Sequence, residues 1–165
     1  MYNNCILTAE QAVLSVRRIA FQILEDNPNE KRIVIAGVMS NGNHVSKSIA
    51  KVLRSISNID VVNCQIRIDK KNPRNKIQTS IEKSEYENQS IVIVDDVLHT
   101  GSTLIYVVRH FLQVSLTKCK VAVLINRNHK KFPIKADYKG ISLSTSMHEH
   151  VEIVCKNDTF EGYLT

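Results

Sequence analysis

The sequence has little that would place the protein in a membrane or in an oxidising compartment. No apolar run approaches the roughly 20 residues needed to span a bilayer, and the amino terminus has no signal-peptide pattern. The cysteines are scattered singly, without a close pair of the kind that binds zinc or performs redox chemistry; they are Cys5, Cys64, Cys119 and Cys155. We therefore expect a soluble cytoplasmic protein whose cysteines are reduced packing residues.

What the sequence does contain is the composition of one ordinary globular domain. The chain has 165 residues, of which 43% are hydrophobic, so it suits a single domain with a proper core. Lys and Arg number 22 against 16 Asp and Glu, which gives a formal net charge of +6. This positive excess suits polyanionic ligands, but it does not distinguish a nucleotide from a nucleic acid.

Alternating apolar patterns predict an α/β fold. Thr8 and Gln11 form a capping box before an amphipathic helix that ends at Asn27-Pro28. Further elements are predicted from periodicity: strands at 33–36, 61–68, 91–94 and 120–126, helices at 44–56 and 102–114, and a mobile loop at 69–90. This order implies a central, mostly parallel sheet that is flanked by helices and joined by right-handed crossovers.

The pattern breaks from Arg127 onward. A basic turn with a proline is followed by short strands near Ile141 and at 151–154. We predict one domain over residues 1–165, with a small hood subdomain formed by the N-terminal segment and roughly residues 127–165. The ligand cleft is expected between the hood and the sheet.

The most informative segment runs from Ile91 to Thr103. Asp95 and Asp96 follow four branched apolar residues and thus stand at the carboxyl end of a buried strand, where ligands bind on open α/β sheets. The next residues, 100–103, supply hydroxyls, a flexible glycine and N–H groups at a helix start, which suit a phosphate. Because carboxylates accept hydrogen bonds from vicinal ribose hydroxyls, the segment predicts a sugar phosphate ligand.

This segment resembles the phosphoribosyl-diphosphate (PRPP) signature of the type I phosphoribosyltransferases. The resemblance implies the type I phosphoribosyltransferase fold, with Asp95 and Asp96 as catalytic residues that steady the ribose. It further implies that the 5-phosphate is held by His99, Thr100, Gly101, Ser102 and Thr103. It also implies Mg²⁺, which would bridge pyrophosphate and ribose oxygens of PRPP, with Asp95 and Asp96 as the available protein ligands.

Two further segments are candidates for the pyrophosphate. The loop from Gly37 to Gly42 leaves a buried strand and enters a helix, so its pyrophosphate contacts would be Met39, Ser40, Asn41 and Gly42. The alternative is a tight turn without a ligand. Related enzymes often carry an arginine or lysine here, whereas this chain does not. Residues 69–76 stand where the family has a flexible lid, with Lys70, Lys71 and Arg74 as its cations.

The downstream part of the chain narrows the resemblance. Residues 121–140, which include Ala136-Asp137-Tyr138, and Thr145-Ser146 look like the pyrimidine-operon attenuators of the PyrR type, which also have uracil phosphoribosyltransferase activity. Asn126, Asn128 and Ser102 depart from that pattern. His99 stands where enzymes for 6-oxopurines usually carry an aspartate, so uracil is the favoured base.

Several alternatives remain open. The protein could be an RNA-binding regulator with little catalysis, since basic residues recur at 127, 130, 131, 135 and 139, or a purine enzyme of similar fold. His148 and His150 share a strand face, but they lack a third metal ligand nearby. Tyr138 is expected to be a packing residue rather than a base-stacking one. We also expect a homo-oligomer, a dimer or larger.

Overall fold

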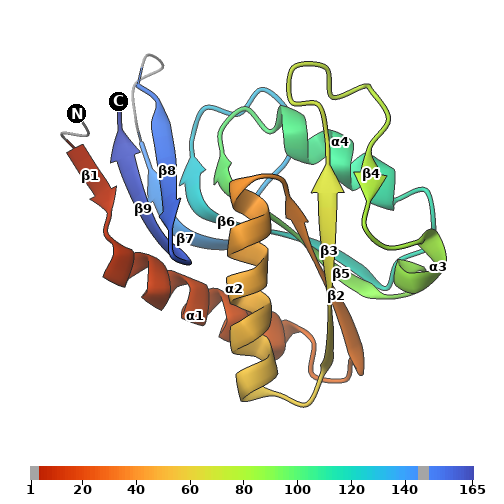
Figure 1. The fold of residues 1–165 in the computed structure, drawn as a ribbon. Coiled ribbons are helices and arrows are strands. Elements are labelled where there is room, and N and C mark those ends of the chain that lie inside the picture. Colours follow the sequence, from red (N-terminus) through yellow and green to blue (C-terminus); the bar gives the residue numbers. More distant parts are fainter. Residues whose placement is uncertain (1–3, 145–148) are drawn as a thin grey trace.

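A computed structural model describes residues 4–144 and 149–165 and contains two β-sheets (Figure 1). The elements in chain order are β1 (Asn4–Leu7), α1 (Ala9–Asp26), β2 (Arg32–Val38), α2 (Asn41–Ile56), β3 (Asp60–Arg67), β4 (Gln78–Thr79), α3 (Lys83–Tyr86), β5 (Ser90–Leu98), α4 (Ser102–Phe111), β6 (Lys118–Arg127), β7 (Tyr138–Leu143), β8 (Val151–Lys156) and β9 (Thr159–Leu164). Of the described helices, none is both long and apolar enough to cross a membrane.

The large sheet has the strand order β4-β3-β2-β5-β6-β7. Its neighbours pair in parallel except β3 with β4, which pair antiparallel. The predicted α/β fold with a mostly parallel sheet is confirmed. Because β5 lies inside this sheet, its consecutive side chains enter two different cores. Val92 and Val94 pack with α1 and α2, whereas Ile91 and Ile93 pack with α4.

The first helix forms where the capping box predicts it. The Gln11 amide donates to the Thr8 hydroxyl oxygen, and the Thr8 amide donates to the Gln11 side chain. The helix ends at Asp26, and the following Asn27 is buried. Its side-chain amide donates to the Ile23 carbonyl, while its oxygen accepts a hydrogen bond from Ser90. This asparagine therefore fastens the end of α1 to the start of β5.

The connection from β2 to α2 is shorter than predicted. The expected loop over 37–42 reduces to Met39 and Ser40, because the strand continues to Val38 and the helix begins at Asn41. The Met39–Ser40 peptide bond is cis. Gly37 permits close packing of β2 on α2, since a Cβ there would lie 2.3 Å from the Ser46 hydroxyl oxygen. Gly37 and Gly42 are both needed for close packing. In the sequence, such glycines look the same as glycines of a flexible loop.

The prediction of an unbroken loop over 69–90 was wrong. The segment contains β4, which pairs with β3, and the one-turn helix α3. Tyr86 of α3 is fully buried, with its ring edge-on to Phe111 at a centroid distance of 5.0 Å. Elements of two and four residues are too short to show an apolar period, which explains why the sequence did not reveal them.

The small sheet has the order β1-β9-β8, with both pairs antiparallel. It joins the two ends of the chain and lies beside α1 in Figure 1. The region that we assigned to the hood from residue 127 divides between the two sheets. The strand near Ile141 is β7, which pairs with β6 at the edge of the large sheet, whereas β8 and β9 join β1.

Candidate active site

The acid pair lies near the end of β5, beside the start of α2. Asp95 is 3% exposed, and its Oδ1 accepts a hydrogen bond of 3.0 Å from the Asp96 amide. Asp96 is partly exposed, and its Oδ1 accepts one of 2.9 Å from the Val97 amide. Burial, together with the charge of Asp96, raises the pKa of Asp95 well above its usual value, while Lys70 opposes the shift. Asp95 therefore binds its proton more tightly than an ordinary aspartate does.

The start of α2 contacts both carboxylates. The Asn41 side-chain amide donates to Asp96 Oδ2 at 3.0 Å and to the Ile153 carbonyl of β8 at 2.9 Å. A Cβ on Gly42 would lie 2.9 Å from both Cα and Oδ1 of Asp95, so only glycine fits at this distance. The structure thus brings two residues of the predicted pyrophosphate loop to the acid pair. Asn41 also connects this site to the small sheet.

The lid segment reaches the acid pair through one residue. Lys70 Nζ lies 3.9 Å from Asp95 Oδ1. Asp69 shapes the turn, because its carboxylate accepts hydrogen bonds from the amides of Asn72 and Lys71, which lower its pKa. In the described part of the chain, neither Lys71 nor Arg74 forms an ion pair with the acids. Arg74 instead lines a cavity beside α4.

The predicted phosphate loop has the expected helix-start geometry. Gly101 is the N-cap of α4 with φ of 83°, a conformation that disfavours residues with a Cβ. The Thr100 hydroxyl accepts a hydrogen bond from the Ser102 amide at 3.3 Å. N–H groups at the start of α4 suit an anion, as the sequence pattern predicts.

Residues after β6 support this loop, a role that we did not anticipate. The amides of Lys131 and Phe132 donate to the Thr100 carbonyl at 2.8 and 3.1 Å. The Ile134 side chain lies directly against Gly101, since a Cβ on the glycine would approach Ile134 Cγ2 to 2.3 Å. The only sequence signal was an apolar Phe-Pro-Ile run inside an otherwise basic turn.

His99 belongs to a positively charged neighbourhood. Its pKa is lowered first by partial burial and then by the charge of Arg127, with further contributions from His129, His150 and Lys131. Arg127 itself is only 1% exposed, so it is not among the exposed basic residues that the RNA-binding alternative requires. The preceding residue, Asn126, donates to the Ser142 hydroxyl at 3.3 Å. Its buried Oδ1 has no partner among the described residues.

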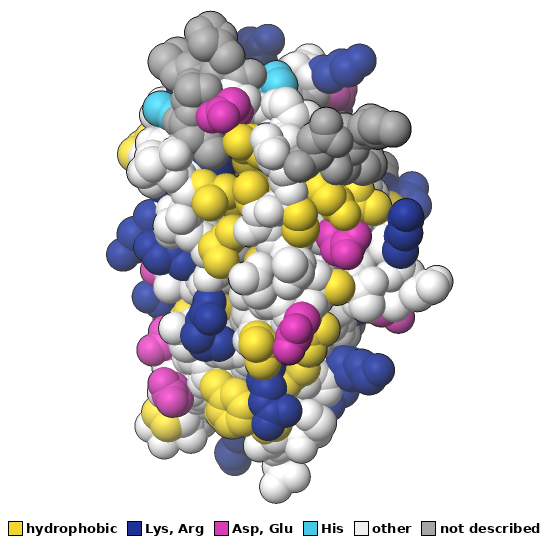
Figure 2. Space-filling model, turned by 90° about the vertical axis from the view of Figure 1, so that its left-hand side faces the viewer, with side chains coloured by type: hydrophobic (Ala, Val, Ile, Leu, Met, Phe, Trp, Pro, Cys, Tyr) yellow, Lys and Arg dark blue, Asp and Glu magenta, His cyan; other side chains and the backbone are white. Residues whose placement is uncertain are grey.

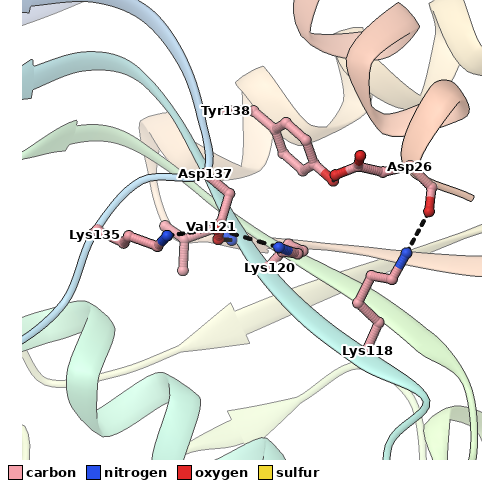
Figure 3. A network of polar contacts seen from close by, with 7 residues as sticks. All are labelled: Asp26, Lys118, Lys120, Val121, Lys135, Asp137 and Tyr138. Carbon is pink, nitrogen blue, oxygen red and sulfur yellow. Dashed lines mark hydrogen bonds and ion pairs between the residues drawn. The ribbon is translucent and has the colours of Figure 1, made fainter.

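The Ala-Asp-Tyr motif has a structural role (Figure 3). Tyr138 is buried, and its hydroxyl donates to Asp26 at 2.6 Å. Asp137 accepts a hydrogen bond from the Val121 amide and forms ion pairs with Lys120 and Lys135. The prediction that Tyr138 is a packing residue is therefore confirmed.

The carboxylates present cannot form a complete metal site by themselves. In the described ranges 4–144 and 149–165, no group of three or more His, Cys, Asp or Glu side chains is placed to hold an ion. His148, part of the alternative histidine pair, lies outside the described residues. A divalent ion beside Asp95 and Asp96 would need most of its oxygen ligands from a substrate.

Comparison with known proteins identifies related sequences and folds. A family model described as the phosphoribosyl transferase domain matches residues 3–157. The bifunctional protein PyrR of Streptococcus thermophilus is 32% identical over 145 residues, covering 85% of this chain and 83% of that protein. The protein of the same name from Fusobacterium nucleatum is 33% identical over 150 residues, covering 86% and 85%.

Solved structures share the fold at lower identity. A hypoxanthine-guanine phosphoribosyltransferase of Bacillus anthracis has a TM-score of 0.80 at 18% identity, covering 99% of this chain and 98% of that chain. The hypoxanthine phosphoribosyltransferase of Trypanosoma cruzi has a TM-score of 0.77 at 14% identity, covering 98% and 96%.

Proposed function

The chain belongs to the phosphoribosyl transferase domain family, and we propose that it transfers the ribosyl 5-phosphate of PRPP to uracil, giving UMP and pyrophosphate. One observation carries this proposal: the acid pair on β5 contacts Asn41 and Gly42 at the start of α2. Since β2 and β5 are parallel neighbours, the segments that follow them meet at one edge of the sheet. A ribose that carries a pyrophosphate beside its hydroxyls needs this combination.

Each part of the site has a role in the proposed reaction. Asp96, the more exposed acid, accepts a hydrogen bond from a ribose hydroxyl. Both acids stabilise the positive charge that develops at the anomeric carbon. Residues 99–103 bind the 5-phosphate, a part of the substrate that does not react, and this binding positions the anomeric carbon. Lys70, with the other lid cations, offsets the charge of the leaving pyrophosphate. The C–O bond to pyrophosphate breaks, the C–N bond to the base forms, and the ring nitrogen of the base releases its proton to water.

Magnesium fits this proposal as a partner of the substrate. Asp95 and Asp96 supply two carboxylates, and the oxygens of PRPP would supply the rest. When bound, the ion neutralises the pyrophosphate and makes it a better leaving group. The chain's own residues then position the ribose and the 5-phosphate.

The choice of uracil rests on two features. His99 occupies the signature position where purine enzymes usually carry an aspartate, and the relatives of about 30% identity are named PyrR rather than after a purine. The solved structures named after hypoxanthine are less than 20% identical, so they bear on the fold and not on the base.

The decisive test is incubation with PRPP, Mg²⁺ and one nucleobase at a time, with pyrophosphate release and the nucleotide product measured. We expect UMP from uracil and at most trace product from hypoxanthine or guanine. Asp95→Asn with Asp96→Asn should nearly abolish turnover, while Lys51→Gln, an exposed change on α2, should not. Product with a purine alone, or full turnover by the double variant, would overturn the proposal.

RNA binding is the second candidate function. The name of the PyrR relatives includes the word bifunctional, and the segment after β6 exposes Lys130, Lys131 and Lys135, with Lys139 nearby on β7. Lysines of this kind contact phosphates without reading sequence, so specificity needs base contacts as well. A gel shift against the leader of its own pyrimidine operon tests this function. The absence of a sequence-dependent shift at moderate salt would exclude this function.

We further propose that the chain acts as one domain and assembles as a homo-oligomer. Figure 2 shows hydrophobic side chains between charged ones on the face that carries α1. Val13 and Leu14 of this helix are 57% and 58% exposed. Sedimentation of the protein and of Leu14→Glu tests this assembly. A monomer at micromolar concentration would contradict it.

A further inference from the structure

A basic cavity is lined by the lid segment, by Lys83 of α3 and by the second half of α4. We call it the α4 groove. Its volume is about 340 Å³, and its wall includes Arg74, Lys76, Lys83, Arg109 and His110. A neighbouring hollow of about 730 Å³ shares Lys76, Lys83 and His110 with it. Cavities of this size accommodate small organic ligands.

The charge of the groove is not balanced by the protein. Its described wall contains four permanent cations and no carboxylate, and the neighbouring hollow is lined by one carboxylate, that of Glu82. None of the four cations forms an ion pair with a described residue, and Lys83 Nζ donates instead to Gln113 Oε1 at 3.0 Å. Four like charges around one cavity repel one another, so a bound anion would stabilise this arrangement.

Two buried polar atoms beside the groove also lack a partner. His110 Nε2 is inaccessible to solvent, and no described group forms a hydrogen bond with it. Burial, followed by the charge of Lys83, lowers the pKa of this histidine. The hydroxyl of Tyr86, in the wall of the neighbouring hollow, has no described partner either. Buried polar groups without partners are rare in proteins and often mark an absent ligand or water.

We propose that the α4 groove binds an oligophosphate anion, the group carried by nucleoside di- and triphosphates. Lysine and arginine side chains from three segments recognise such an anion by charge-assisted hydrogen bonds. The groove differs from the predicted 5-phosphate site, which lies at the first turn of α4, whereas Arg109 and His110 lie in its last turn. Tyr106 in the same wall offers an aromatic surface for a nucleoside.

Occupancy of the groove has a consequence for the lid. Arg74 belongs to both the lid segment and the groove, so a bound anion restrains the chain that also carries Lys70. This consequence rests on the proposed function, because it assumes that the lid closes over PRPP. The binding of the anion itself does not depend on catalysis.

Tripolyphosphate and adenosine triphosphate are suitable probes, followed by the imidazole NMR signals of the folded protein. His110 reports on the groove, and His99 reports on the predicted 5-phosphate site; variants at each histidine assign the signals. We expect saturable shifts of His110 with both probes. Lys83→Gln with Arg109→Gln should weaken the affinity measured from the His110 shifts about tenfold or more, because two charged contacts are lost.

The matched control is Arg17→Gln with Lys51→Gln, which removes the same two side-chain types from exposed positions on α1 and α2. The affinity measured from the His110 shifts should stay within about twofold of that of the unmodified protein, as expected for remote surface charges. The His99 response should persist in both double variants. Arg109→Gln alone, a change at one exposed position, provides a milder variant with a smaller weakening.

Equal binding of the two probes identifies the phosphate chain as the ligand, while tighter binding of adenosine triphosphate adds a nucleoside contact. A His110 signal that moves with neither probe, or that moves equally in the groove variant, overturns the proposal. So does a response to single-stranded RNA but not to tripolyphosphate. If only the His99 shifts were absent, the proposed active site would be contradicted, and the proposal that the α4 groove binds an anion would remain.

Discussion

Lys70 Nζ lies 3.9 Å from Oδ1 of Asp95, so the lid and the acid pair meet through one ion pair. The aspartate side chain is 5% exposed and the lysine side chain is 48% exposed. The charge of Lys70 partly offsets the burial that raises the pKa of Asp95. Lid position and acid ionisation are thereby coupled before any substrate binds.

Replacement of Lys70 tests this coupling. Lys70→Gln should lower kcat/KM for PRPP about tenfold, which corresponds to one charge-assisted hydrogen bond. Because the variant loses the positive charge, the pKa of Asp95 rises further, and the acidic limb of the pH profile moves to higher pH. Steady-state kinetics across pH measures both effects, with Lys51→Gln as the control. A lower rate with an unmoved acidic limb would contradict the coupling.

Asp95 is expected to limit stability. A carboxyl whose pKa is higher in the folded than in the unfolded chain binds its proton more tightly in the folded state. The free energy of unfolding therefore falls as pH rises from the ordinary aspartate range through the raised pKa. Asp95→Asn should raise Tm at neutral pH, and the gain should disappear in acid, below the ordinary range.

Thermal unfolding at several pH values measures this difference. Asp158→Asn, which changes an exposed carboxylate, is the control. A constant Tm difference between Asp95→Asn and the unmodified protein at all pH values would show that ionisation of Asp95 is not the cause.

Asn41 is expected to matter for both stability and substrate binding. Asn41→Ala removes the hydrogen bonds to Asp96 and to the Ile153 carbonyl, at a cost of about 1–3 kcal/mol in unfolding free energy. It should also raise KM for PRPP, because Asp96 loses its fixed position. Denaturant unfolding and kinetics test the variant, with Asn58→Ala at an exposed position as control. Unchanged stability would exclude the link between α2 and β8.

Gly101 and Ile134 are expected to be coupled. Gly101→Ala places a side chain at positive φ, which costs roughly 1–3 kcal/mol, and pushes it into Ile134. In the double variant with Ile134→Ala the clash is gone but the strain remains. The double variant should therefore be less destabilised than the sum of the single variants, by about 0.5–3 kcal/mol. Strict additivity would show that the two residues do not touch.

Tyr138 is expected to contribute to stability and not to base binding. Tyr138→Phe loses the hydrogen bond to Asp26, which lowers the free energy of unfolding by about 1–2 kcal/mol. KM for the nucleobase should stay unchanged, because the ring packs inside the core. Urea unfolding and kinetics distinguish the roles. A weakened base affinity with normal stability would assign Tyr138 to the base site.

Features encoded by neighbouring residues could be predicted from the chain alone. The capping box at Thr8 and the buried run of β5 are local features, and the structure places them as expected. The acid pair, expected at the end of this strand, lies within it, because β5 continues to Leu98. The Thr-Gly loop lies at a helix start for the same reason. Periodicity and turn chemistry act over a few residues, so no knowledge of the tertiary path is needed.

Other features depend on residues far apart in the chain. Asn41 bonds to a carbonyl 112 positions away, Ile134 closes against Gly101, and Arg127 is buried rather than part of a basic surface. The α4 groove likewise joins cations from the lid, α3 and α4. No local pattern records these contacts, because burial and distance are set by how the sheets and helices pack. The ligand class, a sugar phosphate, could be predicted from the segment Ile91–Thr103 alone. The arrangement of the groups that would bind this ligand is decided only by folding.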